Sequence, residues 1–531
     1  MPSLHSLPTE LVEIIFFKLS ARDILVCSST CQYLRLLVLE SSLLQLIIEL
    51  AVSGLRLRNH ANGTLWQSIS VHDRLNALRR SETRWRNLNP KYIARIPLEQ
   101  FEYEVCDGLF GHGISIAHPW FRGIEINRIG LSDENQSCPV WRRYDDVGIF
   151  LADFSFDLAS DLLVLAAAPI QHRTAKDLHL RTLSSNVDHP LVTYPILRGP
   201  GSETWLNTDI KIAGTYLAVH FGHPTFIGPE QGRLCIWEWQ TGDLLHTTTS
   251  TSGFAFLSPA SVAATFFIEE ENGDAVTEIG LFRIGSKEPI VELELPFRAH
   301  PTMCSVLSDR PLVDAPSSLS NHSPAPFMAD ETAAKVFVLQ MDNFNRHIFV
   351  AVKPLLELLD AGALRSSNSA IPHANRYSWT EWGPPSTFWL QSHVIEPGYT
   401  SVSGSRVCAV SHIKQLFDTN VPSGEENMGI VRSCTLGTEN VRPGATTILV
   451  MDFNMRSIEY LNGRAGRTDL FAPNIRWEID VEGETMISTL PFRAFQIEQV
   501  PYIEAIVTPD HIIGIRDTQD GTVYEVLQFT E

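Results

Sequence analysis

The sequence predicts an α+β chain of more than one domain, in which a small all-α region precedes a much larger all-β region. With 531 residues, the chain exceeds the usual size of a single hydrophobic core. Its N-terminal residues repeat their apolar positions with a helical period, whereas short β-branched runs recur from about Phe101 onward. A hydrophobic content of 44% with 19% charged residues is typical of a folded globular protein.

The first helix is expected directly after Pro8, because the missing N–H of a proline would be unpaired in the first helical turn anyway. An apolar stripe with the spacing i, i+3, i+4, i+8 follows it, and consists of Leu11, Ile14, Ile15 and Leu19. Ser20 to Asp23 resembles a capping box and predicts a second helix. A third helix is expected over 32–39, and a fourth begins at Ser42.

Short helices of this kind cannot bury so much Leu, Ile and Phe among themselves, so another chain or the following domain must cover part of their surface. The motifs occur in the order Leu-Pro-x-Glu-Leu (7–11), Ile-Ile (14–15), Asp-Ile-Leu (23–25) and Cys-x-x-Leu-Arg (31–35). This order resembles an F-box over roughly residues 4 to 50, and we assign residues 1–50 to it. The resemblance implies docking on a Skp-family adaptor, and through it on a cullin–RING ubiquitin ligase.

Matching positions of the family identify the candidate adaptor-binding residues. These are Leu7, Pro8, Leu11, Ile14, Ile15, Leu19, Ile24, Leu25 and Cys31. Some of them must instead hold the helices together, and the sequence does not separate the two sets. The chain departs from the family at Leu34, where a Trp is usual, and this departure concerns adaptor affinity. The alternative interpretation is that these helices are only the N-terminal cap of a larger fold.

Residues 51–97 are expected to form a helical linker. Ser70 and Asp73 predict a helix start, and Asn89-Pro90 predicts its end. One face of this helix is apolar and consists of Val71, Leu75, Leu78, Trp85 and Leu88. The other face is basic and consists of Arg74, Arg79, Arg80, Arg84 and Arg86. Such a face is solvated, or pairs with the acidic body, more often than it binds a partner. We expect a semi-rigid connector, because Trp85 needs a surface to pack on.

Residues 98–531 are expected to form one large all-β region. Short β-branched or alternating runs separated by Gly, Pro, Asn or Asp include 101–105, 149–154, 161–166, 216–219, 233–239, 279–283, 336–339, 448–451 and 512–515. Sandwiches and barrels rarely reach this size, whereas radial repetition of similar sheets does. The unit 234–245, with its Thr-Gly turn, resembles the outer hairpin of a WD-repeat-type blade, and 209–219 resembles its inner hairpin. The sequence therefore predicts a β-propeller of about seven blades.

Several stretches interrupt the rhythm of the strands. The segments 309–334 and 418–447 are expected to be long loops, the first of them mobile, and 354–360 a short amphipathic helix. Loops on a rigid ring are where a recognition surface would lie. Trp379 and Trp382 are interpreted as core residues, with a partner anchor as the alternative.

Charge and cysteine usage restrict the partners and the compartment. A formal net charge of -20 argues against nucleic acid as the main ligand. The eight cysteines include no Cys-x-x-Cys pair, so we expect no metal, no disulfide and a reducing compartment, cytoplasmic or nuclear. We expect no signal peptide and no membrane span, since Glu10 and Glu13 interrupt the apolar start.

No catalytic constellation or cofactor motif emerges from the sequence. Gly113-Ile114-Ser115 lacks the last glycine of a nucleophile elbow, and Gly463 to Thr468 has the wrong spacing for a phosphate loop. His220 and His223 could contribute to a zinc site, but no cysteine or carboxylate partner stands near them in the sequence.

The sequence therefore favours a non-catalytic substrate adaptor of a Skp–cullin–F-box ubiquitin ligase, which binds an unknown client through its propeller. A propeller scaffold without a ligase role is the alternative, and a propeller enzyme with acidic or His residues in its central channel is a third. The combination of F-box, Arg-rich helix and irregular propeller resembles divergent F-box proteins of mushroom-forming fungi.

Overall fold

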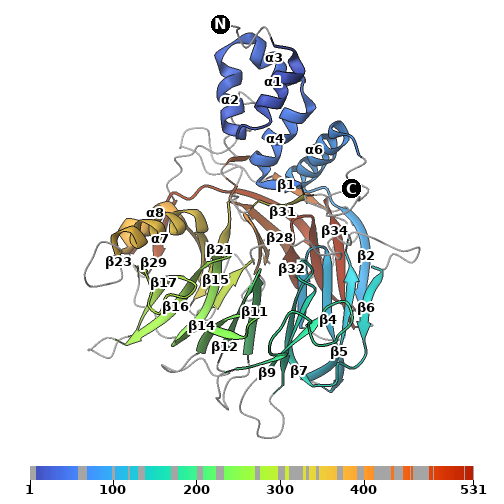
Figure 1. Ribbon diagram of the computed structural model, residues 1–531, viewed down its shortest axis with the longest axis vertical. Coiled ribbons are helices and arrows are strands. Elements are labelled where there is room, and N and C mark those ends of the chain that lie inside the picture. The colour runs from blue at the N-terminus through green and yellow to red at the C-terminus, as the bar shows by residue number, and fades with distance from the viewer. Residues whose placement is uncertain are drawn as a thin grey trace.

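The structure is a computed structural model. It describes residues 7–57, 69–97, 102–117, 120–129, 138–168, 177–199, 207–222, 232–269, 275–296, 305–309, 327–330, 334–341, 346–366, 375–391, 400–411, 432–435, 446–454, 456–457, 477–481, 484–518 and 521–529. Four short helices project from one side of a ring of β-sheets, and a fifth helix lies between them and the ring (Figure 1).

The four N-terminal helices form a module of their own, called the helical module below. They are α1 (Thr9–Phe16), α2 (Ala21–Thr30), α3 (Gln32–Glu40) and α4 (Ser42–Ser53). The hydroxyl of Ser20 accepts a hydrogen bond from the Asp23 N–H at 3.2 Å, so the predicted capping residue does begin α2. Gly54 ends α4 with a φ of 69°, a left-handed conformation that glycine adopts without a steric cost.

The core of the helical module lies beside the predicted apolar stripe of α1 rather than along it. Val12 and Phe16 of α1 are buried there, together with Ile24, Leu34, Leu37, Val38, Leu44 and Ile48 from the other three helices. Leu11, Ile14 and Ile15 remain exposed. The helix is therefore apolar on two sides, and only one of them is used by the fold.

Among the described residues, seven four-stranded antiparallel units follow one another around the ring, which confirms the predicted fold class. The first blade consists of β3 (Tyr103–Cys106), β4 (Leu109–Ala117), β5 (Trp120–Arg128) and β6 (Val140–Tyr144). The second consists of β7 (Leu151–Asp157), β8 (Leu162–Ala167), β9 (Asp177–Thr182) and β10 (Ile196–Arg198). The third consists of β11 (Asn207–Ala213), β12 (Tyr216–Gly222), β13 (Gly232–Glu238) and β14 (Asp243–Thr249). The fourth consists of β15 (Thr251–Ser258), β16 (Ser261–Glu269), β17 (Ala275–Arg283) and β18 (Val291–Glu294).

The remaining three blades carry insertions or strands from distant parts of the chain. The fifth consists of β19 (Ser305–Ser308), β21 (Val336–Met341), β22 (Arg346–Ala351) and β24 (Thr387–Gln391). The sixth consists of β25 (Thr400–Ser403), β26 (Arg406–Ser411), β28 (Thr446–Asp452) and β31 (Arg493–Val500), with β27 (Arg432–Thr435) added in parallel to β31. The seventh consists of β32 (Glu504–Val507), β33 (His511–Thr518), β34 (Gly521–Gln528) and β2 (Lys91–Pro97). A separate hairpin is formed by β29 (Trp477–Val481) and β30 (Glu484–Ser488).

Burial on both faces explains why the second strands of the blades are continuous apolar runs. In β8, Leu163 and Leu165 pack against the first blade, whereas Leu162, Val164 and Ala166 pack against the third. Because successive side chains of a strand point to opposite faces, each blade offers one set of side chains to each neighbour. The ring is thus held together by face-to-face burial between blades rather than by a single core.

The ring closes by pairing the two ends of the β-region. Strand β2 pairs antiparallel with β34 at the C-terminus, and the Tyr103 hydroxyl of β3 donates a hydrogen bond to Glu504 of β32 at 2.7 Å. The structure here differs from the predicted helical linker over 51–97, because 91–97 is a strand. Ala94 and Ile96 are buried between the seventh and first blades, and this alternation favours a strand over a helix.

The predicted loop 309–334 contains a strand. Strand β20 (Phe327–Ala329) leaves the fifth blade and pairs antiparallel with β1 (Leu55–Leu57), directly after α4. The expectation of a mobile insertion is therefore wrong for 327–329, because their main chain is paired and Phe327 and Met328 are buried. Residues 310–326 and 331–333, and 418–447 apart from β27 and the start of β28, lie outside the described residues.

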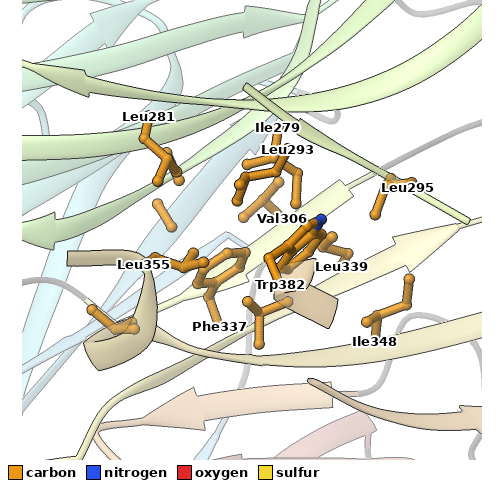
Figure 2. Packing of buried hydrophobic residues seen from close by; sticks show 14 of the residues in the cluster. Ile279, Leu281, Leu293, Leu295, Val306, Phe337, Leu339, Ile348, Leu355 and Trp382 are labelled. Carbon is orange, nitrogen blue, oxygen red and sulfur yellow. The ribbon is translucent and has the colours of Figure 1, made fainter. Parts of the chain in front are cut away.

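Two helices inserted between β22 and β24 complete the largest core cluster. They are α7 (Val352–Ser366), which contains the predicted helix 354–360, and α8 (Trp379–Ser386). Figure 2 shows Trp382 among side chains from the fourth and fifth blades, such as Leu293 and Leu339. Its indole N–H donates a hydrogen bond to the Glu294 carbonyl at 2.8 Å. Trp379 and Trp382 are thus core residues, and β23 (Asn375–Tyr377) pairs in parallel with β18 beside them.

Buried histidines make the stability of the ring depend on pH. Burial lowers the pKa of His347 to about 4 and that of His511 to about 3, from an ordinary 6.5. Below pH 6.5 these histidines are protonated in the unfolded chain but stay neutral in the folded chain. Their contribution to the free energy of unfolding is therefore fully present above pH 6.5 and is lost as the pH falls toward 4. We expect each of these two histidines to lower the free energy of unfolding by about 2 kcal/mol between pH 7 and pH 5.

Urea unfolding at pH 7 and pH 5 measures this loss, and the variant His347→Gln should lose about 2 kcal/mol less than the parent between the two values. The same substitution at the exposed His72 is the matched control. Equal losses for the parent and His347→Gln would contradict the assignment.

Candidate functional site

The helical module exposes large apolar side chains that nothing in the described chain covers. Eight large apolar side chains from α1, α2, α3 and the residue after α1 are between 39% and 58% exposed: Leu11, Ile14, Ile15, Phe17, Leu25, Val26, Leu36 and Leu39. A soluble protein rarely exposes so many large apolar side chains on one small unit unless they form an interface. We call these eight residues the docking face.

The structure separates the nine predicted adaptor-binding residues into two sets. Leu11, Ile14, Ile15 and Leu25 belong to the docking face, and Pro8 is exposed beside them. Ile24 is fully buried in the core of the helical module. Leu7, Leu19 and Cys31 are partly buried against the same core. Four of the nine therefore hold the helices together, and five are available to a partner.

Four residues of the docking face were not predicted: Phe17, Val26, Leu36 and Leu39. Phe17 lies two positions after Ile15 and Val26 one position after Leu25. Neither position belongs to the apolar stripe that the helical period predicts. Leu36 and Leu39 are three apart on α3, and this spacing on one helix face was the available signal.

The departure from the family at Leu34 lies inside the helical module. Its side chain is buried in the core with Val12, Phe16 and Leu37. A substitution at this position changes internal packing, and the docking face keeps its exposed residues.

The connector helix α6 (Val71–Asn87) packs one end against α4. Leu75 and Leu78 lie in a cluster with Leu46 and Leu50 of α4, and Phe327 of β20 completes it. On the surface, the guanidinium of Arg79 donates hydrogen bonds to both oxygens of the Glu49 carboxylate, the shortest at 2.6 Å. The predicted basic face thus pairs in part with an acidic residue of the chain itself.

The other end of α6 is anchored in the ring by Trp85. Its ring stacks on Phe529 with centroids 3.8 Å apart and an interplanar angle of 13°. The guanidinium of Arg406 lies 4.3 Å from the centroid of the same indole ring. Trp85 is 3% exposed and belongs to a cluster formed by the sixth and seventh blades. The connector is therefore part of the ring core at this end.

A buried polar network lies beside this anchor. Arg406 contacts Glu82 of α6 at 3.4 Å and Asp452 at 3.9 Å, and Arg493 contacts Asp452 at 2.9 Å. Burial has the largest single effect and would raise the pKa of Asp452. The guanidinium groups of Arg493 and Arg406, with hydrogen bonds from the Asn454 N–H and the Ser405 hydroxyl, together hold that pKa below its ordinary value. The carboxylate stays charged at neutral pH and links two arginines of the sixth blade to the connector.

Main-chain contacts fix the last turn of α4 on the same side. The Asn454 side-chain amide donates to the Val52 carbonyl at 2.9 Å, and the Asp330 N–H donates to the Gly54 carbonyl at 2.9 Å. Together with the β1–β20 pairing, these bonds tie the helical module to the fifth and sixth blades. The docking face is thus held in one position relative to the ring.

A cavity of about 340 Å³ lies at the centre of the ring. It is lined by the inner strands β3, β11, β19, β25 and β32, and by Phe327 and Met328 of β20. Acidic residues also line it, as the enzyme hypothesis requires, but neighbouring groups hold two of them. Asp209 pairs with Lys211 at 3.1 Å, and Asp309 accepts a hydrogen bond from the Gly404 N–H at 3.0 Å.

The sequence candidates for chemistry are not assembled into a site. Ser115 lies within strand β4, and the His220 ring is buried with Nε2 3.0 Å from the Thr251 carbonyl oxygen. Burial also lowers the pKa of His220 below its ordinary value. His223 lies outside the described residues. Within the described ranges, no group of three or more His, Cys, Asp or Glu side chains could hold a metal ion.

No single helix in the described part of the chain is long and apolar enough to cross a membrane. The pair Gln32–Glu40 and Ser42–Ser53, bent by 82°, would pass on length and composition alone.

Comparison with known proteins identifies the helical module. The family model of the F-box domain matches residues 4–46, so the chain carries an F-box domain at its N-terminus. No curated protein sequence matches the chain.

Several solved structures are similar to parts of this one. Sqt1 of Saccharomyces cerevisiae is 9% identical, with 82% of this chain and 85% of Sqt1 covered and a TM-score of 0.36. Hydrazine synthase of Kuenenia stuttgartiensis is 10% identical, with 49% of this chain and 66% of that protein covered and a TM-score of 0.31. An alpha-L-arabinanase of Penicillium chrysogenum is 8% identical, with 61% and 94% covered and a TM-score of 0.29. The assignment of seven blades rests on the strand pairing of this chain itself.

The anchor of the connector can be tested by truncating Trp85. We expect Trp85→Ala to lower the free energy of unfolding by about 3–5 kcal/mol, because it empties a packed site between two blades. Amide hydrogen exchange should accelerate in α4 and α6 and stay unchanged in the third blade. Thr83→Ala, on the exposed side of the same helix, is the control. Unchanged exchange in α4 and α6 would show that Trp85 does not hold the connector.

Proposed function

We propose that the chain is the substrate-recognition subunit of a Skp–cullin–F-box ubiquitin ligase. The observation that carries the proposal is the docking face, which lies within the F-box match and is uncovered in the described chain. Burial of several Leu, Ile and Phe side chains is the dominant source of affinity in such an interface. The partner is a Skp-family adaptor, and through it a cullin.

The contribution of the chain to ubiquitin transfer is proximity, and its role is non-catalytic. The docking face holds the adaptor, while the ring holds a client protein. Binding both at once raises the effective concentration of client lysines near the charged ubiquitin carrier. A connector with a fixed geometry helps, because a flexible one would spread the client over a larger volume and lower that concentration.

Two structural observations bear on the alternative functions. The scaffold hypothesis drew on the departure at Leu34, and this residue lies in the core rather than on the docking face. The enzyme hypothesis draws on the acidic lining of the central cavity, but Asp209 and Asp309 are engaged by neighbouring groups. Both observations favour the adaptor role. We further propose a cytoplasmic or nuclear location, and a lineage among the divergent F-box proteins of fungi.

Paired substitutions on the docking face test the proposal. We expect Ile14→Asp/Ile15→Asp to weaken binding to a purified Skp-family adaptor by about 100-fold or more, because two apolar side chains that the adaptor would bury become charged. Leu36→Asp/Leu39→Asp, which the sequence did not predict, should have a similar effect. Biolayer interferometry measures the affinity, and circular dichroism checks the fold.

Two controls separate binding from folding. Leu364→Asp changes a side chain that is 70% exposed on α7 and should leave adaptor binding unchanged. Ile24→Asp changes a core residue and should unfold the helical module. Full adaptor binding by Ile14→Asp/Ile15→Asp, or no binding by the parent chain, would refute the proposal.

A further inference from the structure

Exposed apolar side chains gather at a second place, on the outer rim of the second and third blades. Outside the docking face, most exposed large apolar residues of the described chain lie singly, such as Ile268 and Leu364. The loop between β9 and β10 instead exposes Leu191 and Tyr194 in addition to Val187, and Ile196 on β10 and Leu244 on β14 are exposed as well. We call Leu191, Tyr194, Ile196 and Leu244 the rim patch.

The loop that carries the rim patch is anchored from below by other residues. His189 packs edge-on against Trp239 with ring centroids 5.0 Å apart, and its Nε2 lies 3.0 Å from the Ser160 carbonyl oxygen. Val192 packs against the core shared by the two blades. The Thr193 N–H donates a hydrogen bond to the Gln240 carbonyl at 2.8 Å and ties the loop to the third blade. The fold of the loop is thus secured without the exposed side chains.

The side chains that project outward resemble those at the centre of protein interfaces. Leu191 and Tyr194 are 61% and 59% exposed. The Tyr194 ring lies close to Gly242 in the β13–β14 turn, where an added Cβ would meet it at 2.8 Å, so the ring bridges the two blades. Tyrosine and its aliphatic neighbours on a rigid backbone lose little entropy on binding, and tyrosine is enriched among residues that dominate interface energies.

The charges around the rim patch specify the chemistry of its partner. The loop 183–195 and the turn 239–244 contain one ionised side chain each, Asp188 and Asp243, and both are exposed. Arg198 on β10 stands directly opposite Asp177 of β9 in the strand register. The loop and the turn that carry the apolar residues therefore contribute two exposed carboxylates and no Lys or Arg, which favours basic residues beside an apolar anchor.

The rim patch lies on the same side of the ring as the docking face. Strands alternate in direction within each blade, so the connections between first and second and between third and fourth strands share one side. The β25–β26 turn belongs to that side, and Arg406 directly after it contacts Glu82 of the connector helix α6. The β9–β10 loop is a connection of the same kind. The sixth and seventh blades hold α6. Going around the ring from the rim patch to these blades, one passes the first blade in one direction and the fourth and fifth blades in the other.

We propose that the rim patch is the client-binding surface, and that it takes a short segment with an aromatic or aliphatic anchor flanked by Lys or Arg. The proposal rests on the adaptor function in that the partner is the client of the ligase. The segment buries its anchor on Leu191, Tyr194 and Leu244, and its basic residues pair with Asp188 and Asp243. A client bound here lies on the side of the ring from which the adaptor projects.

Selection of short random peptides against the full chain tests the proposal, with counter-selection against Leu191→Ser/Tyr194→Ser. We expect enriched peptides to combine an apolar anchor with Lys or Arg, and to bind the parent chain about tenfold or more tighter than this variant. Asp188→Lys/Asp243→Lys should also weaken them, and the loss should shrink at high salt. The control Ile268→Ser removes an exposed apolar residue elsewhere and should bind the peptides normally.

Other outcomes would overturn the proposal. These are peptides that bind the parent and Leu191→Ser/Tyr194→Ser equally, peptides without basic residues, or self-association of the chain that this variant abolishes in sedimentation. Adaptor binding is measured on the same preparations. If the adaptor binds and the peptides fail, only the rim patch is wrong. If the peptides bind and the adaptor does not, the ligase function is wrong and the rim patch remains a docking surface.

Discussion

The architecture depends on the packing of Trp85 between the connector helix and the last two blades. Its stack on Phe529 and its contact with Arg406 join three segments that are far apart in the sequence: α6, the sixth blade and the C-terminal end of the chain. Directly after α6, strand β2 pairs with β34 and closes the ring. The joint that positions the helical module and the joint that closes the ring are therefore neighbours, and each supports the other.

This arrangement gives the two ends of the molecule different physical tasks. The helical module keeps one apolar side for its core and leaves the other for a partner, as Val12 and Ile14 show on the same helix. The ring buries most of its strands on both faces, and the rim patch is where exposed apolar side chains from two neighbouring blades occur together. A rigid body between two such surfaces is what a proximity mechanism requires.

Much of the fold, and part of the candidate site, could be predicted from the sequence. The periodicity of apolar residues located the helices and the β-region, as in α1 and β8, because the local pattern of burial sets that periodicity. It could not show that 91–97 joins the last blade or that 327–329 pairs with β1, because both pairings join segments far apart in the sequence. It could not separate Ile24 from Leu25 either, since only the packed module shows which of two adjacent apolar residues faces inward. The rim patch was missed because its residues come from two blades.

The central claim is that the docking face and the ring form one rigid body. Spin labels on the exposed residues Arg22 of α2 and Leu364 of α7 would measure it, through the distance distribution from double electron–electron resonance. The account predicts a single narrow distribution that an added Skp-family adaptor leaves unchanged. A broad or multiple distribution, or one that narrows only when the adaptor binds, would contradict it.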